Sequence, residues 1–296
     1  MLSRVAPWLA SHKEGTATSG ISVRVLGGAD TKALTELAHQ DPVTNVFILA
    51  HLEATGSAAV TSAGAGVFGI FDNATLIAAC WCGANLVPVQ LPPELTGMVA
   101  GAIHASGRRY ASAFGPADTV LALYGHLERL GHQAHEVRED QPLMTISGPP
   151  LIEANALLAT GRMADFNQIL PACVAMFEEE VGYSPYLGGR EFYNRRVEGL
   201  IREGHSLAYV TEAGDVIFKA ELGAVTQCVT QVQGVWMNPE HRGLGLSAGY
   251  MAGVVRHAQA FAPITSLYVN SYNTRAKASY ERVGFTTVNT FATVLF

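Results

Sequence analysis

The chain of 296 residues carries 19 Lys and Arg against 25 Asp and Glu, a formal net charge of −6, and 49% of it is hydrophobic. This length and apolar content predict one large or two ordinary well-packed domains and exclude a disordered chain. The acidic balance predicts no basic surface for nucleic acid, and no apolar run reaches the ~18 residues of a membrane span. The N-terminus contains Arg4 and Trp8 but no apolar region of the kind that signal peptides have, so we expect no secretory signal.

The cysteines indicate the redox environment. Four occur along the chain: Cys80, Cys82, Cys173 and Cys228. Their spacing fits neither a disulfide framework nor a zinc pattern, so we expect free thiols and a reducing, cytoplasmic compartment. His132 and His135 lie near one another without a third ligand at metal-binding spacing, and we expect no metal site.

The first half alternates between strand and helix patterns. Residues 1–20 are polar and small near their end, and we expect them to fray. Asp30 is a plausible N-cap, Asp72-Asn73 is a hairpin turn, and Gly131 ends a helix. The predicted order is strand, two helices, three strands, helix, strand, helix, strand, over 21–26, 30–38, 46–52, 67–71, 76–82, 86–90, 98–105, 110–114, 117–130 and 137–146.

The second half has the same coarse order. Two helices are predicted, then three strands, and then helix, strand, helix and strand. Their ranges are 165–180, 193–203, 207–211, 216–222, 228–237, 245–260, 266–270, 274–283 and 286–295. The parallel between the halves predicts a tandem duplication of one fold, with a flexible 1–20, a first domain over 21–147, a proline-containing linker over 148–151 and a second domain over 152–296.

The segment Val232 to Gly249 carries the strongest functional pattern. Val232 to Met237 is a predicted strand, Asn238-Pro239-Glu240 breaks it, and a turn containing Gly243 and Gly245 leads directly into a helix. A strand, a glycine turn and a helix N-terminus together present free backbone N–H groups to an anion. The pattern predicts a phosphate cradle, although a turn with two glycines alone also arises for conformational reasons.

A second pattern follows about thirty residues later. It consists of Asn273, Ala276, Tyr280 and the pair Gly284-Phe285. Together with Pro239-Glu240-His241-Arg242-Gly243-Leu244-Gly245-Leu246-Ser247, it resembles the GNAT superfamily of acyl-CoA-dependent N-acetyltransferases. Ser247 stands where that family usually has Gly or Ala. The resemblance covers roughly residues 164–296.

The resemblance implies an α/β (α+β) protein made of tandem GNAT-like domains, each a mixed, mostly antiparallel sheet flanked by helices. The first half has Leu91-Pro92-Pro93-Glu94 where the second half has its glycine turn. Because proline has no N–H, this half resembles a degenerate GNAT domain without a phosphate cradle. The layout resembles that of mycothiol synthases, and the second half resembles uncharacterised actinobacterial acetyltransferases more closely.

Acetyl-CoA is the cosubstrate that the resemblance implies. Its phosphates would meet the amides of Gly243 to Ser247, and its pantetheine arm would pair with the backbone of a splayed strand. Tyr280 would be the general acid, since a phenol of pKa ~10 can protonate a leaving thiolate. The cofactor-binding residues implied in this way are Val235, Trp236, Met237, Arg242, Gly243, Leu244, Gly245, Leu246, Ser247, Asn270 and Asn273.

Each of these residues also has a purely structural interpretation. Arg242 could anchor its turn, and Asn273 could cap a helix, while Trp236 and Met237 are better explained as core side chains. Tyr280 could simply pack on the core-facing side of its helix.

The general base is not evident from the sequence. Glu221 is a candidate because an inward carboxylate on a strand needs a reason, and a water chain is equally possible. The acidic run Glu178-Glu179-Glu180 could attract a cationic amine.

We therefore expect an enzyme that moves an acetyl group from acetyl-CoA to a primary amine, on a small molecule, a protein lysine or a protein N-terminus. The alternatives are a non-catalytic acetyl-CoA-binding sensor and an aminoacyl- or long-chain acyltransferase. We expect an amine partner, no nucleic acid or membrane partner, and a monomer or homodimer. A proline-bearing first half predicts a single active site in the chain.

Overall fold

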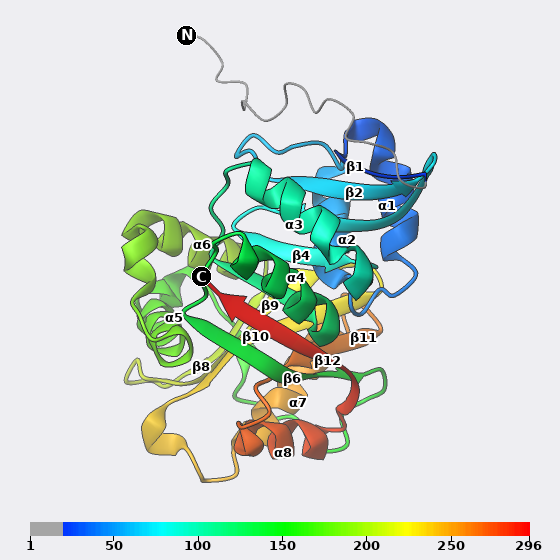
Figure 1. Ribbon diagram of the computed structural model, residues 1–296. Coiled ribbons are helices and arrows are strands. Elements are labelled where there is room, and N and C mark those ends of the chain that lie inside the picture. Colours follow the sequence, from blue (N-terminus) through cyan, green and yellow to red (C-terminus); the bar gives the residue numbers. More distant parts are fainter. Residues whose placement is uncertain (1–19) are drawn as a thin grey trace. The chain divides into compact units, whose positions relative to one another are not determined.

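A computed structural model describes residues 20–296, and the chain divides into two compact units. The first unit combines the chain up to Pro142 with Asn289–Phe296, and the second is Leu143–Val288. Apart from Gly20, the segment expected to fray lies outside the described residues. Figure 1 shows strands and flanking helices in both units.

The first unit follows the predicted order of elements. Its strands are β1 (Ile21–Val25), β2 (Gly66–Asp72), β3 (Thr75–Cys82), β4 (Asn85–Val89), β5 (Ser112–Pro116), the first part of β6 (Glu136–Ile146) and most of β12 (Thr286–Leu295). Its α-helices are α1 (Thr31–Ala38), α2 (Val46–Thr55), α3 (Thr96–Ala105) and α4 (Ala117–Arg129). The sheet order is β1-β2-β3-β4-β5-β12, and β4 and β5 form its parallel pair.

Helices cover both faces of this sheet. On one face α1 and α2 bury Leu34 and Leu49 with strand residues such as Val67, and on the other α3 and α4 bury Ile103 and Leu123 with residues such as Phe68. Neighbouring strand residues thus enter opposite clusters, as a pleated strand requires.

The second unit repeats this plan. Its strands are the end of β6, β7 (Ala159–Thr160), β8 (Ser206–Val210), β9 (Val216–Val225), β10 (Val229–Met237), β11 (Ile264–Tyr268) and the beginning of β12. Its α-helices are α5 (Phe166–Val181), α6 (Arg190–Arg202), α7 (Ser247–Ala258) and α8 (Thr274–Val283). The order is β6-β11-β10-β9-β8-β7, in which β10 and β11 form the parallel pair.

Both faces of the second sheet are also covered. Helices α7 and α8 pack on the larger cluster, where Met251 and Val283 are fully buried, and α5 and α6 pack on a smaller cluster around Cys173 and Val197. Helix α7, which lies within the range predicted as 245–260, buries Ala248, Met251, Val255 and Ala258, whose spacing puts them on one side of a helix. The expected fold class, a mixed, mostly antiparallel sheet flanked by helices in each half of the chain, is confirmed.

Two strands contribute to the sheets in a way that the linear order did not indicate. Phe291–Leu295 of β12, at the end of the chain, pairs antiparallel with β5 of the first unit. Leu143–Ile146 of β6 pairs antiparallel with β11 of the second unit. Each unit therefore completes its sheet with a strand segment from the far side of the 148–151 linker.

Within the described residues, no helix is long and apolar enough to cross a membrane.

Candidate functional site

The two parallel strands of the second unit diverge after a short pairing. Only Val229–Gln231 of β10 pairs with Ile264–Ser266 of β11. Further along β10, two residues, Gly234 and Val235, stand opposite the single residue between Lys219 and Glu221 on β9, which is a β-bulge. Gly234 has φ +57°, a conformation that glycine adopts without strain. The divergence leaves the β11-facing edge of β10 accessible to an extended ligand.

The turn after β10 presents a row of free backbone donors. Asn238 caps it by accepting a hydrogen bond from the Glu240 amide at 3.1 Å. In the part of the chain that the structure describes, the amides of residues 243–246 donate no hydrogen bond, and α7 begins directly after them. Unpaired amides at a helix N-terminus are suited to a phosphate group.

The two glycines of this turn are needed for their backbone conformation. Gly243 has φ +80° and Gly245 has φ +75°, and a Cβ built on either meets no atom within 4 Å. Steric crowding within the protein therefore does not explain them, whereas the left-handed conformation does.

Arg242 anchors the turn to its surroundings. Its Nε donates to the Met237 carbonyl at 2.9 Å, and its Nη2 lies 2.8 Å from Glu179 Oε2 on α5. Glu179 Oε1 also accepts from Trp236 Nε1 at 3.1 Å. The anchoring role that the sequence left open for Arg242 is thus observed, and Glu179 connects α5 with both β10 and the turn.

Tyr280 is almost completely buried on α8, with 6% of its surface exposed. Burial raises the pKa of its phenol, and the negative charge of Glu180 raises it further. The phenol therefore stays protonated at neutral pH and can act only as a proton donor. Its hydroxyl has no hydrogen-bond partner among residues 20–296, so the proton is not committed to another group of the protein.

The other predicted cofactor residues have mixed environments. Asn273 is the N-cap of α8, where its side chain accepts from the Ala276 amide at 3.2 Å, so the capping interpretation is confirmed. Met237 belongs to the core cluster, as expected, and Val235 packs against that cluster. The expectation that Trp236 is a core side chain is wrong, because this side chain is only half-buried and donates to Glu179. Asn270 is half-buried directly after β11, and its contact with a cofactor stays a prediction.

Glu221 lies in a buried charge cluster. Its carboxylate is 2.5 Å from Lys219 Nζ, and both side chains are 1% exposed or less. Burial on its own raises the pKa of Glu221, but the charges of Lys219 and Arg196 and the hydrogen bonds from Lys219 and Cys173 outweigh this, so the pKa lies below its usual value. A carboxylate of lowered pKa with a permanent partner is a weak base. Its role as the general base stays a prediction, and its surroundings favour a structural role.

Three site features escaped the sequence analysis. Glu179 was recognised only as part of an acidic run, and its bonds to Trp236 and Arg242 depend on tertiary contacts. Glu180 lies close enough to Tyr280 to act on it electrostatically, which no sequence signal indicated. The bulge at Gly234 did have a signal, because an isolated glycine inside a strand pattern is typical of a β-bulge.

The second unit thus combines a diverging parallel strand pair, a bulge on one of its strands, free amides at a helix N-terminus and a buried phenol. In a comparison with family models, residues 174–285 match the acetyltransferase (GNAT) family. The second unit therefore carries a GNAT acetyltransferase domain. Residues 65–169 match a domain of unknown function, DUF4081, consistent with a degenerate first half.

Solved structures share the fold over nearly the whole chain. A GCN5-related N-acetyltransferase from Sphaerobacter thermophilus has a TM-score of 0.59 at 17% identity, with 94% of this chain and 96% of that chain covered. A GNAT-family acetyltransferase from Colwellia psychrerythraea has a TM-score of 0.57 at 13% identity, with 93% and 99% covered. A tandem GNAT protein from the clavulanic acid biosynthesis pathway has a TM-score of 0.53 at 14% identity, with 92% and 98% covered. No curated protein matches the chain.

Proposed function

We propose that the second unit transfers an acetyl group from acetyl-CoA directly to a primary amine. The observation that carries this proposal is the row of four unpaired amides at residues 243–246, at the end of a strand that diverges from its parallel neighbour. Anionic phosphate and an extended amide-containing arm are the chemical groups that suit such a site. Coenzyme A carries both.

The residues have separate roles in this proposal. The amides of residues 243–246 and the N-terminus of α7 bind the pyrophosphate, and the bulge at Gly234 exposes backbone N–H groups that polarise the thioester carbonyl. The amine attacks the carbonyl carbon, the C–S bond breaks, and Tyr280 donates its proton to the departing sulfur. The products are an N-acetyl amide and a free thiol.

The proton of the attacking amine needs an acceptor. Glu180 is better placed than Glu221, because it is exposed and acts electrostatically on Tyr280, whereas Glu221 is held by Lys219. We propose Glu180, directly or through water, as the base. The exposed carboxylates at the end of α5 would also attract a cationic acceptor. The free thiols of the four cysteines support a reducing compartment such as the cytoplasm for this activity.

Calorimetric titration of the full chain with acetyl-CoA tests the binding part of the proposal. We expect one equivalent to bind, and Gly245→Val to weaken binding more than about tenfold, because a β-branched residue resists the left-handed conformation. Gly131→Val is the matched control, since Gly131 also has positive φ and open space but lies in the first unit. Equal loss of affinity in both variants would count against the proposed cradle.

Release of free thiol in the presence of a panel of amines tests the catalytic part. Amine-dependent release supports the transferase. Tight binding of acetyl-CoA without turnover on any amine would favour the alternative, a non-catalytic acetyl-CoA-binding module.

A further inference from the structure

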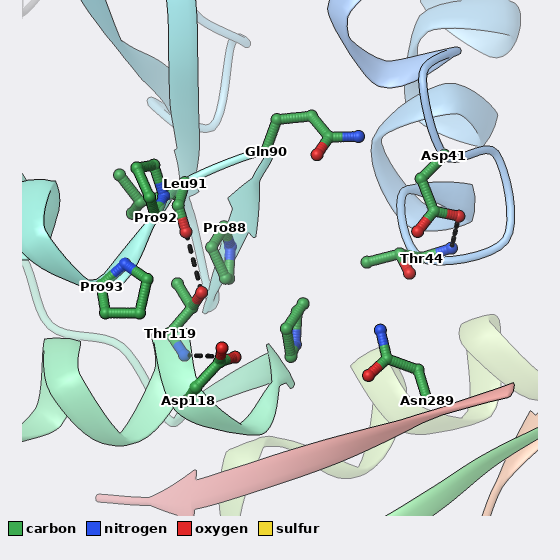
Figure 2. Close-up of a pocket in the computed structure, with 11 residues that line it drawn as sticks. Asp41, Thr44, Pro88, Gln90, Leu91, Pro92, Pro93, Asp118, Thr119 and Asn289 are labelled. Carbon is green, nitrogen blue, oxygen red and sulfur yellow. Dashed lines mark hydrogen bonds between the residues drawn. The ribbon is translucent and has the colours of Figure 1, made fainter.

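The first unit contains a cavity at the position that corresponds to the cofactor cradle of the second. There too the parallel strands diverge early: only Asn85 and Leu86 of β4 pair with Ser112 and Ala113 of β5. Beyond this pairing lies a cavity of about 320 Å³, shown in Figure 2. Its walls come from the ends of β4 and β5 and the segments that follow them, from the turn before α2 and from β12.

The chemistry of this cavity is opposite to that of a phosphate site. Four prolines, Pro88, Pro92, Pro93 and Pro116, line it. They supply rigid apolar surface and no N–H donors. Asp118 occupies the first turn of α4, so the position where an anion would meet the helix N-terminus already carries a negative charge. The lining contains no Lys or Arg.

Two carboxylates face the cavity, and each keeps one oxygen available. Asp41 Oδ1 accepts from the Thr44 amide at 3.1 Å, and Asp118 Oδ1 accepts from the Thr119 amide at 2.9 Å. These local bonds fix the two side chains at the cavity rim. Within residues 20–296, the second oxygen of each carboxylate accepts no hydrogen bond.

Amide side chains complete the polar part of the lining. Figure 2 shows Gln90 and Asn289 extending toward the same open space as Asp41. The amide oxygens of these side chains can accept further hydrogen bonds. Gln90 is also held at φ +47°, an unfavourable conformation for a residue other than glycine.

We propose that this cavity binds a small organic cation, an aliphatic primary amine whose ammonium group lies between Asp41 and Asp118. An ammonium has three N–H donors, which match the free carboxylate and amide oxygens, and its methylene chain packs on the proline rings. Coenzyme A does not bind here, since its phosphates would meet two carboxylates and no amide donors. The degenerate half thus recognises a ligand of opposite charge to the cofactor of the second unit.

Titration calorimetry of the full chain at low salt tests this proposal, with 1,4-diaminobutane as the probe and 1,4-butanediol as its uncharged analogue. We expect the diamine to bind and the diol to give no signal. Asp41→Asn and Asp118→Asn should each weaken binding about threefold to tenfold, because a partly exposed charge-assisted hydrogen bond is lost. Both variants keep the oxygen that accepts the backbone bond, so thermal unfolding should be unchanged. Asp140→Asn, an exposed carboxylate on β6 outside the cavity, is the matched control.

Three results would overturn the proposal. Equal binding of the diamine to wild type and to both variants would place its site outside this cavity. Binding of the diol with the same affinity as the diamine would show that charge has no role. A second equivalent of acetyl-CoA that binds more tightly in Asp118→Asn would show that the cavity is an anion site. Failure of acetyl-CoA to bind anywhere refutes the proposed transferase and leaves the amine site standing.

Discussion

The buried pair of Lys219 and Glu221 makes a strong prediction about stability. Lys219→Met keeps the length of the side chain and removes its charge, so the Glu221 carboxylate remains buried with Arg196 at 3.5 Å as its nearest cation. Removing one partner of a buried ion pair costs about 3–5 kcal/mol, because the other charge is left uncompensated. In a unit of this size each kcal/mol lowers the melting temperature by about 2–4 °C. We therefore expect the second unit to melt about 6–20 °C lower.

Glu221→Gln should cause a loss of similar size, because it leaves the Lys219 ammonium buried without a counter-ion. The double variant should lose less than the sum of the two, with a coupling energy of at least ~2 kcal/mol. Thermal and urea unfolding of the full chain measures all four species. Single variants within about 1 kcal/mol of wild type, or strict additivity, would refute the reasoning.

The pair also predicts the pH range over which it stabilises the fold. The pKa of Glu221 is lowered in the folded protein. Its contribution to stability is therefore present above pH ~4.3, the ordinary pKa of Glu, and is lost as the pH falls through the pKa of the folded state. Burial on its own lowers the pKa of Lys219. The negative charge of Glu221 outweighs burial, so the pKa of Lys219 lies above its ordinary value. The contribution of Lys219 to stability is present below pH ~10.4, the ordinary pKa of Lys, and is lost as the pH rises through the pKa of the folded state. The deficit of Lys219→Met should shrink as the pH falls, because without Lys219 burial raises the pKa of Glu221 and protonation relieves the buried charge of the variant.

Three further substitutions test the site. Tyr280→Phe should lower turnover about 10²-fold and leave acetyl-CoA binding unchanged, since only the acid is removed; unchanged turnover would exclude the acid role. Gly234→Ala should lower the free energy of unfolding by about 1–3 kcal/mol and weaken acetyl-CoA binding. The reason is that Gly234 has φ +57° and that the new Cβ would lie 3.1 Å from Met176 Cε. A neutral effect would mean that the bulge relaxes freely. Glu179→Gln should cost less than about 1 kcal/mol in urea unfolding, since Glu179 and Arg242 are 46% and 40% exposed, and a larger loss would mean that the turn depends on this pair.

Local patterns made most elements of the fold predictable from the sequence. The ends of α8 and β12 fall at the predicted residues, because Asn273 caps the helix and Gly284 ends it with φ +116°. The strand expected at 110–114 begins two residues later, at Ser112, and β7 was not predicted at all. A two-residue strand has no periodicity to recognise, since it is defined only by its pairing with β8.

The site was predictable only as far as it depends on short segments. Asn273 as a cap, Arg242 as an anchor and the glycine turn were all considered from adjacent residues. The environment of Glu221 was predictable only in part. Lys219 lies two residues before it on the same face of β9, whereas Cys173 comes from α5 and Arg196 from α6, which meet β9 only in the folded unit. The cavity of the first unit was not predictable from the sequence either. The prolines indicated only that a phosphate cradle is absent, and Asp41 and Asn289 lie beside them only in the folded unit.

The position of β12 leads to a last prediction, for a chain that ends at Val288. Such a chain keeps every residue of the second unit. It loses Ala292 and Val294, which are buried in the α3–α4 cluster of the first unit, and Phe291, which is also buried. Burial of Phe291 and Val294 alone contributes about 3–6 kcal/mol, and β5 loses its antiparallel partner. Hydrogen exchange should therefore show lost protection of the amides in β5, with those in β10 still protected, and a peptide of residues 286–296 should restore the protection. Equal loss in β5 and β10 would contradict this assignment of β12, because the second unit would then depend on the same strand.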